Sequence, residues 1–157
     1  MDDTSADELV TALLTASRAL VGVSARSLAT VEDTVTIAQF RSLVVLATKG
    51  PSTLAHLAGE LGVTASTAQR QVDRLVGQEL VTRRENPEDR REVVITITTA
   101  GKRIVDTATR RRRKAIAAIV ANMSPVDSDA LIEALDAFAR AASEPIADSD
   151  GAARLGW

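Results

Sequence analysis

The chain has 157 residues, of which 45% are hydrophobic and 25% are charged, so it is long enough to bury the core of one domain. It has no cysteine and a single histidine, which excludes disulfides, cysteine-ligated zinc, iron–sulfur clusters and a multi-histidine metal site within one subunit. The charge content and the acidic N-terminus argue against disorder, a membrane span and a signal peptide, so we expect a cytoplasmic protein without a membrane partner.

The formal net charge of −2 hides an uneven distribution. From Arg41 to Lys114 the chain carries fifteen Lys and Arg against eight Asp and Glu, whereas both flanks are acidic. A basic middle between acidic ends is typical of a segment that binds a polyanion, although charge by itself more often marks a solvated surface.

The first half of the chain predicts four helices. Apolar residues recur at helical spacing over 7–28 and 37–47. Gly50-Pro51 ends the second of these helices, and we expect Ser52 to cap a short third helix that Gly62 closes. Thr64 then caps a fourth helix with a narrow apolar stripe of Ala65, Ala68, Val72, Leu75 and Val76. The short helix, tight turn and fourth helix form a helix–turn–helix.

The second half predicts a hairpin and two further helices. The β-branched runs 80–84 and 92–97 are separated by a charged, turn-rich spacer, which is typical of a hairpin with a projecting loop. Thr98 can cap a long helix over 99–120, with Gly101 in its first turn, where a side chain would clash. Ser124-Pro125 starts a last helix that runs through Ala142. The residues after Pro145 show no periodicity.

Several motifs in this order resemble the MarR family of bacterial transcriptional regulators. The matching segments are 54–64, Val72-Asp73-Arg74-Leu75, Leu80-Val81-Thr82-Arg83, and Asp89-Arg90-Arg91 followed by Ile97-Thr98-Thr99-Ala100-Gly101. The last run resembles the family's wing signature, with Ile97 where the family has Leu. The resemblance covers roughly residues 9–142.

The resemblance implies a fold that is mainly α with a small β-hairpin wing, a winged helix–turn–helix flanked by N- and C-terminal dimerisation helices. We expect a single domain over residues 1–157. Its DNA-binding region spans about 36–98, its dimerisation helices 5–30 and 99–143, and its tail 144–157.

A recognition helix in the major groove needs short hydrogen-bonding side chains and cations on its outer face. The fourth helix offers candidates of both kinds: Ser66, Thr67, Gln69, Arg70, Gln71 and Arg74. We expect Arg70 to contact a base and Arg74 a phosphate; in the alternative, Gln69 or Gln71 contacts the base and Arg70 a phosphate. In isolation, such polar residues would indicate only the solvated face of a helix.

The wing carries Arg90 and Arg91 at its tip. The resemblance implies that Arg91 probes the minor groove, which suits a guanidinium in a narrow groove of strong negative potential. Asp89 would repel phosphate, so we expect it to stabilise the wing by pairing with a neighbouring Arg.

Two other features have ordinary explanations. The run from Arg110 to Lys114 covers more than a full helical turn, so we expect solvent or the acids Glu133 and Asp136 to receive most of its cations. We expect His56 to be a partly buried helix residue rather than a ligand or a pH sensor.

The apolar stripes of the terminal helices are too extensive for one small domain to cover, which indicates a homodimer. Such a dimer would bind double-stranded DNA at an inverted repeat, and the resemblance implies a repressor that a small organic effector, a phenolic or aromatic acid, releases. With few aromatics, its pocket would be aliphatic, near Phe40 and Arg41. We expect no enzyme activity, no cofactor and no metal. The alternative is a dimeric interaction or ligand-binding module without operator recognition.

Overall fold

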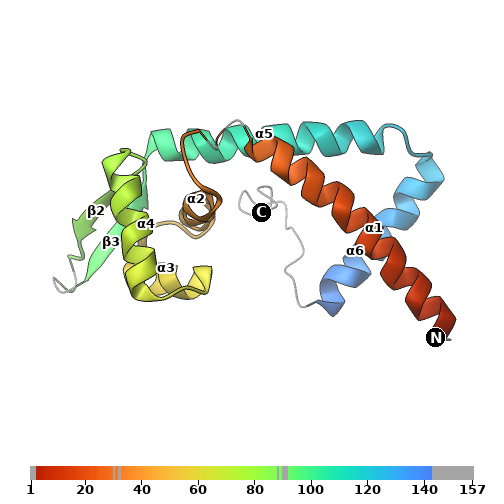
Figure 1. Ribbon diagram of the computed structural model, residues 1–157, viewed down its shortest axis with the longest axis horizontal. Helices are drawn as coiled ribbons and strands as arrows, with labels where there is room; N and C mark the ends of the chain where they lie inside the picture. The colour runs from red at the N-terminus through yellow and green to blue at the C-terminus, as the bar shows by residue number, and fades with distance from the viewer. Residues whose placement is uncertain (1–2, 30, 32, 88, 90–91, 143–157) are drawn as a thin grey trace.

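The computed structural model describes residues 3–29, 31, 33–87, 89 and 92–142. Figure 1 shows the short helices of the middle of the chain and a small sheet gathered at one end of a long helix, with the first and last helices toward its other end. The elements in chain order are α1 (Asp3–Leu28), α2 (Ile37–Lys49), β1 (Ser52–Thr53), α3 (Leu54–Leu61), α4 (Ala65–Gly77), β2 (Val81–Glu85), β3 (Val93–Ile97), α5 (Thr99–Val120) and α6 (Pro125–Ala141). The predicted fold, mainly helical with a small β wing, is confirmed.

Hydroxyl side chains define where the helices from α2 to α6 begin. Each of these helices follows a Ser or Thr whose side-chain oxygen accepts the backbone N–H three residues later, which satisfies an otherwise unpaired donor. These capping residues are Thr36, Thr53, Thr64, Thr98 and Ser124. The predicted caps Thr64, Thr98 and Ser124 are therefore confirmed.

The predicted cap at Ser52 is wrong by one residue. Ser52 and Thr53 form strand β1 and pair with Ile95 and Val94 of β3, so Ser52 is extended and Thr53 caps α3. The predicted hairpin of β2 and β3 is thus part of a three-stranded antiparallel sheet in the order β1-β3-β2. A strand of two residues has no periodicity by which a sequence could reveal it.

The turn between α3 and α4 depends on a glycine. Gly62 has φ of 65°, a left-handed conformation that glycine adopts without a steric penalty, and its N–H bonds back to carbonyls of α3. The chain reverses here and Thr64 starts α4 at once. The predicted helix–turn–helix is confirmed.

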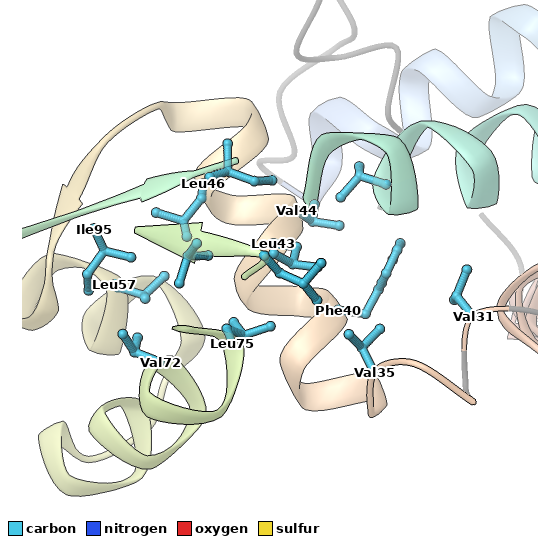
Figure 2. Packing of buried hydrophobic residues seen from close by; sticks show 14 of the residues in the cluster. Val31, Val35, Phe40, Leu43, Val44, Leu46, Leu57, Val72, Leu75 and Ile95 are labelled. Atoms are coloured by element: carbon cyan, nitrogen blue, oxygen red, sulfur yellow. The ribbon is translucent and has the colours of Figure 1, made fainter. Parts of the chain in front are cut away.

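One hydrophobic core joins α2, α3, α4 and the sheet to the start of α5. Figure 2 shows Leu43 and Leu46 of α2 close to Leu57, Leu75 and Ile95 from the surrounding elements. The start of α5 joins this core through Val105 and Ala108. We call residues 37–97 the winged unit, and its core sets the position of α4 and the hairpin.

Gly101 lets α5 approach the winged unit closely. A Cβ at this position would meet the backbone oxygen of Leu80 and would lie 2.7 Å from Cγ1 of Ile97. Backbone cannot yield as a flexible side chain can, so the expected clash at this position is confirmed.

The other end of the molecule is packed sparsely. We call α1, α6 and the C-terminal half of α5 the arm. The described residues of α6 include none that are buried, and those of α1 bury only Val23, Ser27 and Leu28. Large apolar side chains instead lie exposed along the arm: Leu9, Val10, Leu14, Leu20, Val21, Ile119, Val120, Val126, Leu131, Ile132, Leu135 and Phe138.

Helix α1 combines length with apolar character. By length and composition alone, the segment Ser5–Leu28 could cross a membrane, because an 18-residue window within it has a mean hydropathy of 1.3, and 6% of that window is buried. Helices that pack in soluble proteins meet the same criterion, and α1 packs against α5.

Candidate nucleic-acid interface

Helix α4 has one buried face and one open face. Ala68, Val72 and Leu75 are fully buried and hold the helix against the core. The opposite face carries Ser66, Arg70 and Arg74, all exposed. A helix held rigidly along one side, with polar and cationic groups on the other, can enter a major groove.

The hydroxyl groups at the start of α4 form a small cluster. The Thr64 hydroxyl lies 3.1 Å from that of Ser66 and donates to Oγ1 of Thr67 at 3.0 Å. The guanidinium of Arg70 donates to the same Thr67 oxygen at 3.4 Å. Ser66, Thr67 and Arg70, three of the expected DNA-contacting residues, therefore lie together at the N-terminal end of α4.

Both glutamines of α4 have intramolecular hydrogen-bond partners. Gln71 accepts a hydrogen bond of 2.9 Å from Ser42 of α2, a residue with 0% exposure, so its amide faces the α2 side of the helix. Gln69 donates through Nε2 to Oδ1 of Asp73 at 3.0 Å. Intramolecular partners therefore engage both amides, and the expected DNA contacts of Gln69 and Gln71 stay predictions.

An ion pair that the sequence did not predict joins α4 to the hairpin. Nη2 of Arg83, on β2, donates to Oδ1 of Asp73 at 2.6 Å. This hydrogen bond, followed by that from Gln69, holds the pKa of the Asp73 carboxyl below the usual value of an aspartate. The spacing of Gln69 and Asp73 by one helical turn was visible in the sequence, whereas the contact with Arg83 depends on the fold.

The turn between β2 and β3 is only partly described. The N–H of Glu92 donates to the backbone oxygen of Asp89 at 2.9 Å, and the N–H of Asn86 donates to the backbone oxygen of Glu92 at 2.9 Å. Asp89 is exposed. Arg90 and Arg91 lie outside the described residues, so their expected roles and the expected pairing of Asp89 with an arginine stay predictions.

Two cavities flank α4. One of about 320 Å³ lies between α3, α4 and the hairpin and is lined by Thr53, Leu54, Ala55, Ala65, Gln69, Arg83, Glu92, Val93 and Ile95. Another of about 270 Å³ lies between the start of α2 and α4, beside Arg70 and Arg74. Phe40 is 2% exposed and packs in the core, and the expectation of an effector pocket near Phe40 and Arg41 stays a prediction.

The basic run on α5 points largely to solvent. Arg110, Arg111, Arg113 and Lys114 are exposed, whereas Arg112 is half-buried and burial lowers the pKa of its guanidinium. Among the described residues, the ion pairs join Lys49 and His56 to Glu60 and Arg83 to Asp73, and none includes Glu133 or Asp136. Of the two expected destinations for these cations, solvent is the one that this structure favours.

His56 is more exposed than expected. Its side chain is 54% exposed and its Nε2 lies 3.8 Å from Oε1 of Glu60, one turn further along α3. Leu57 and Ala58 are the buried neighbours, so His56 lies on the solvent side of α3. Within the part of the chain that the structure describes, no cluster of three or more His, Cys, Asp or Glu residues could hold a metal ion.

Comparison with known proteins assigns a family to this arrangement. The MarR family model matches residues 35–93, which covers α2 to the start of β3. No curated protein sequence gives a significant match. Among solved structures, the protein RV1404 from Mycobacterium tuberculosis is 47% identical to this chain, over 93% of it and 98% of that protein, with a TM-score of 0.79.

More distant structures share the fold. A MarR family protein from Bacillus stearothermophilus has a TM-score of 0.80 at 22% identity, over 92% of this chain and 99% of that one. Wild-type MarR from E. coli has a TM-score of 0.67 at 23% identity, over 83% of this chain and 95% of that one. The helix–turn–helix, the wing and the relationship to RV1404 over nearly its whole length together show that the chain belongs to the MarR family, whose members have the fold of DNA-binding transcriptional regulators.

Proposed function

We propose that the protein is a sequence-specific repressor that binds double-stranded DNA as a homodimer. The observation that carries this proposal is the open face of α4, where Ser66, Arg70 and Arg74 are exposed opposite a fully buried stripe. In this role α4 is the recognition helix, and residues 36–98 form the DNA-binding region. Arg70 reads a base, Arg74 contacts a phosphate, and Arg91 reaches the minor groove from the wing.

The exposed apolar side chains of the arm support the homodimer. Helices within 5–30 and 99–143 expose apolar side chains such as Leu14, Leu135 and Phe138, each 48–63% exposed in the single chain. Many exposed large apolar side chains on neighbouring helices are typical of an interface between chains. A two-fold dimer presents two copies of α4 to successive major grooves, so the operator is an inverted repeat with half-sites about one helical turn apart.

A small organic acid is the effector class that we propose. A structure with 21% identity and a TM-score of 0.56, over 82% of this chain and 91% of that one, describes regulation of DNA binding of Bordetella bronchiseptica BpsR by 6-hydroxynicotinic acid. In the present chain the cavity of about 320 Å³ has Arg83 and Gln69 on its wall, beside α4. A guanidinium in a partly apolar cavity suits a carboxylate on a ring.

The alternative is a dimeric module that binds partner proteins or a ligand without recognising an operator. The exposed cations on α4 favour the DNA-binding role, because a partner-binding module has no need of Arg70 and Arg74 at these positions. DNA binding also predicts a steep loss of affinity with salt, since cations that neutralise phosphates release counterions.

Selection of bound sequences from a random pool of duplex DNA tests the proposal directly. We expect an enriched inverted repeat, and we expect its affinity to fall steeply as salt is raised from about 50 to 200 mM. A pool without an enriched motif, together with weak binding to every sequence, would favour the alternative module. Adding phenolic and aromatic acids to the selected complex then tests for an effector.

A further inference from the structure

The open side of α4 carries an acid, Asp73, whose side chain is 52% exposed. It lies one turn after Gln69 and one residue before Arg74, in the helix that we propose enters the major groove. An isolated carboxylate there would repel the phosphates of DNA. Its presence on this helix therefore calls for a role other than direct contact with DNA.

The contacts of Asp73 show what this role is. A single carboxylate oxygen, Oδ1, accepts hydrogen bonds from Nε2 of Gln69 at 3.0 Å and from Nη2 of Arg83 at 2.6 Å. Gln69 belongs to α4 and Arg83 to β2, so the oxygen joins the helix to the hairpin. Charge-assisted hydrogen bonds of this kind are directional and stronger than neutral ones.

Apolar packing does little to hold this part of the hairpin against α4. In β2 only Val81 is buried, and residues 82–85 are exposed. The cavity of about 320 Å³ separates α4 from the hairpin at this level, with Gln69 and Arg83 on its wall. Core packing through Val81, Ile95 and Ile97 holds the base of the hairpin. Beyond that base, among the described residues, the Asp73–Arg83 pair is the ion pair that joins the hairpin to α4.

We propose that Asp73 and Arg83 are positioning residues that fix the wing hairpin relative to the recognition helix, so that both can engage one DNA site together. The inference rests on the proposed DNA-binding function. Arg83 then serves the geometry of the interface and is not a phosphate contact, even though it is a cation beside the recognition helix.

The direction in which one substitution changes the affinity for DNA tests this proposal. Asp73→Asn removes a negative charge next to DNA, so electrostatics alone predicts tighter binding. If the carboxylate positions the wing, the same change weakens binding to the selected operator, by about five- to tenfold at constant salt, and lowers the ratio of operator to scrambled affinity. Glu85→Gln is the matched control, because it removes an exposed acid from strand β2, the strand that carries Arg83, and it should not weaken binding.

A cycle with Arg83→Gln completes the test. In the positioning role Asp73→Asn has no further weakening effect once Arg83 is replaced, so the two changes are strongly non-additive. Circular dichroism and thermal melting should match wild type, because the pair is substantially exposed and exposed pairs add little stability. Tighter binding by Asp73→Asn, or additive effects in the cycle, would overturn the proposal. Failure of wild type to bind any selected DNA would instead overturn the proposed function.

Discussion

The winged unit and the arm differ in how far they bury their apolar side chains. In the winged unit, Leu43, Leu57 and Leu75 are 0% exposed, and the helices that carry them, α2, α3 and α4, contact one another within a single chain. In the arm, α6 buries none of its described residues, and Leu14 of α1 is 63% exposed. The arm has apolar residues in similar amphipathic patterns but lacks an intramolecular surface to cover them. An amphipathic pattern therefore predicts that a face will be buried, without saying by which chain.

The largest difference that this comparison predicts is in the stability of the single chain. Leu43→Ala leaves a cavity among α2, α4 and the sheet and should cost about 2–5 kcal/mol of unfolding free energy. Leu14→Ala, at an exposed position of α1, should change the unfolding free energy of the winged unit little. Chemical denaturation at a concentration low enough to keep the chain monomeric measures both. Equal losses would show that the two regions fold as one tightly coupled unit.

The next largest effect concerns association. Leu135→Asp places a carboxylate on the proposed dimer surface, where burial of an unpaired charge costs several kcal/mol. Because Leu135 is 48% exposed in the single chain, we expect a folded monomer that binds the operator poorly, not an unfolded chain. Light scattering measures the mass, and Asp129→Ala, a polar position of the same helix, is the control. A stable Leu135→Asp dimer would remove this helix from the interface.

A smaller effect separates two cations within the winged unit. Arg70→Ala should cost about 1–3 kcal/mol on the operator and less on a site altered at the contacted base. Arg74→Ala should weaken all sequences about equally and reduce the salt slope by about one unit. Binding titrations on operator and scrambled duplexes at several salt concentrations measure both changes. Equal losses on both duplexes for Arg70→Ala would assign it to phosphate instead.

The smallest predicted effect is a change in the pKa of Glu60, where α2 meets α3. Nζ of Lys49 lies 2.7 Å from Oε2 of Glu60, and this contact is the main reason that the pKa of Glu60 is lowered. A lowered carboxyl pKa stabilises the fold above the pKa of the unfolded chain, and this contribution disappears as pH falls through the folded pKa. Lys49→Met should therefore raise the pKa of Glu60 toward the usual value, as followed by NMR. Lys102→Met, which removes a cation from α5, should leave it unchanged.

Local chemistry in the sequence was enough to place most elements. Thr64, Thr98 and Ser124 cap helices where predicted, and Gly62 adopts the left-handed conformation that ends α3. These features depend on neighbours within four residues, so a sequence reveals them directly. The family resemblance rested on the same local motifs, and it is confirmed.

The tertiary structure decided which polar side chains of α4 stay open. Ser66, Gln69, Arg70 and Gln71 look equivalent as polar positions of one amphipathic helix. The partners of the two glutamines differ. Gln71 accepts a hydrogen bond from Ser42 of α2. Gln69 donates to Asp73, which also accepts a hydrogen bond from Arg83 of β2. Ser42 lies 29 residues before Gln71. Arg83 lies 10 residues after Asp73. A helical period assigns a side chain to a face, but a hydrogen-bond partner on another element is set by how the elements pack, which requires the three-dimensional fold.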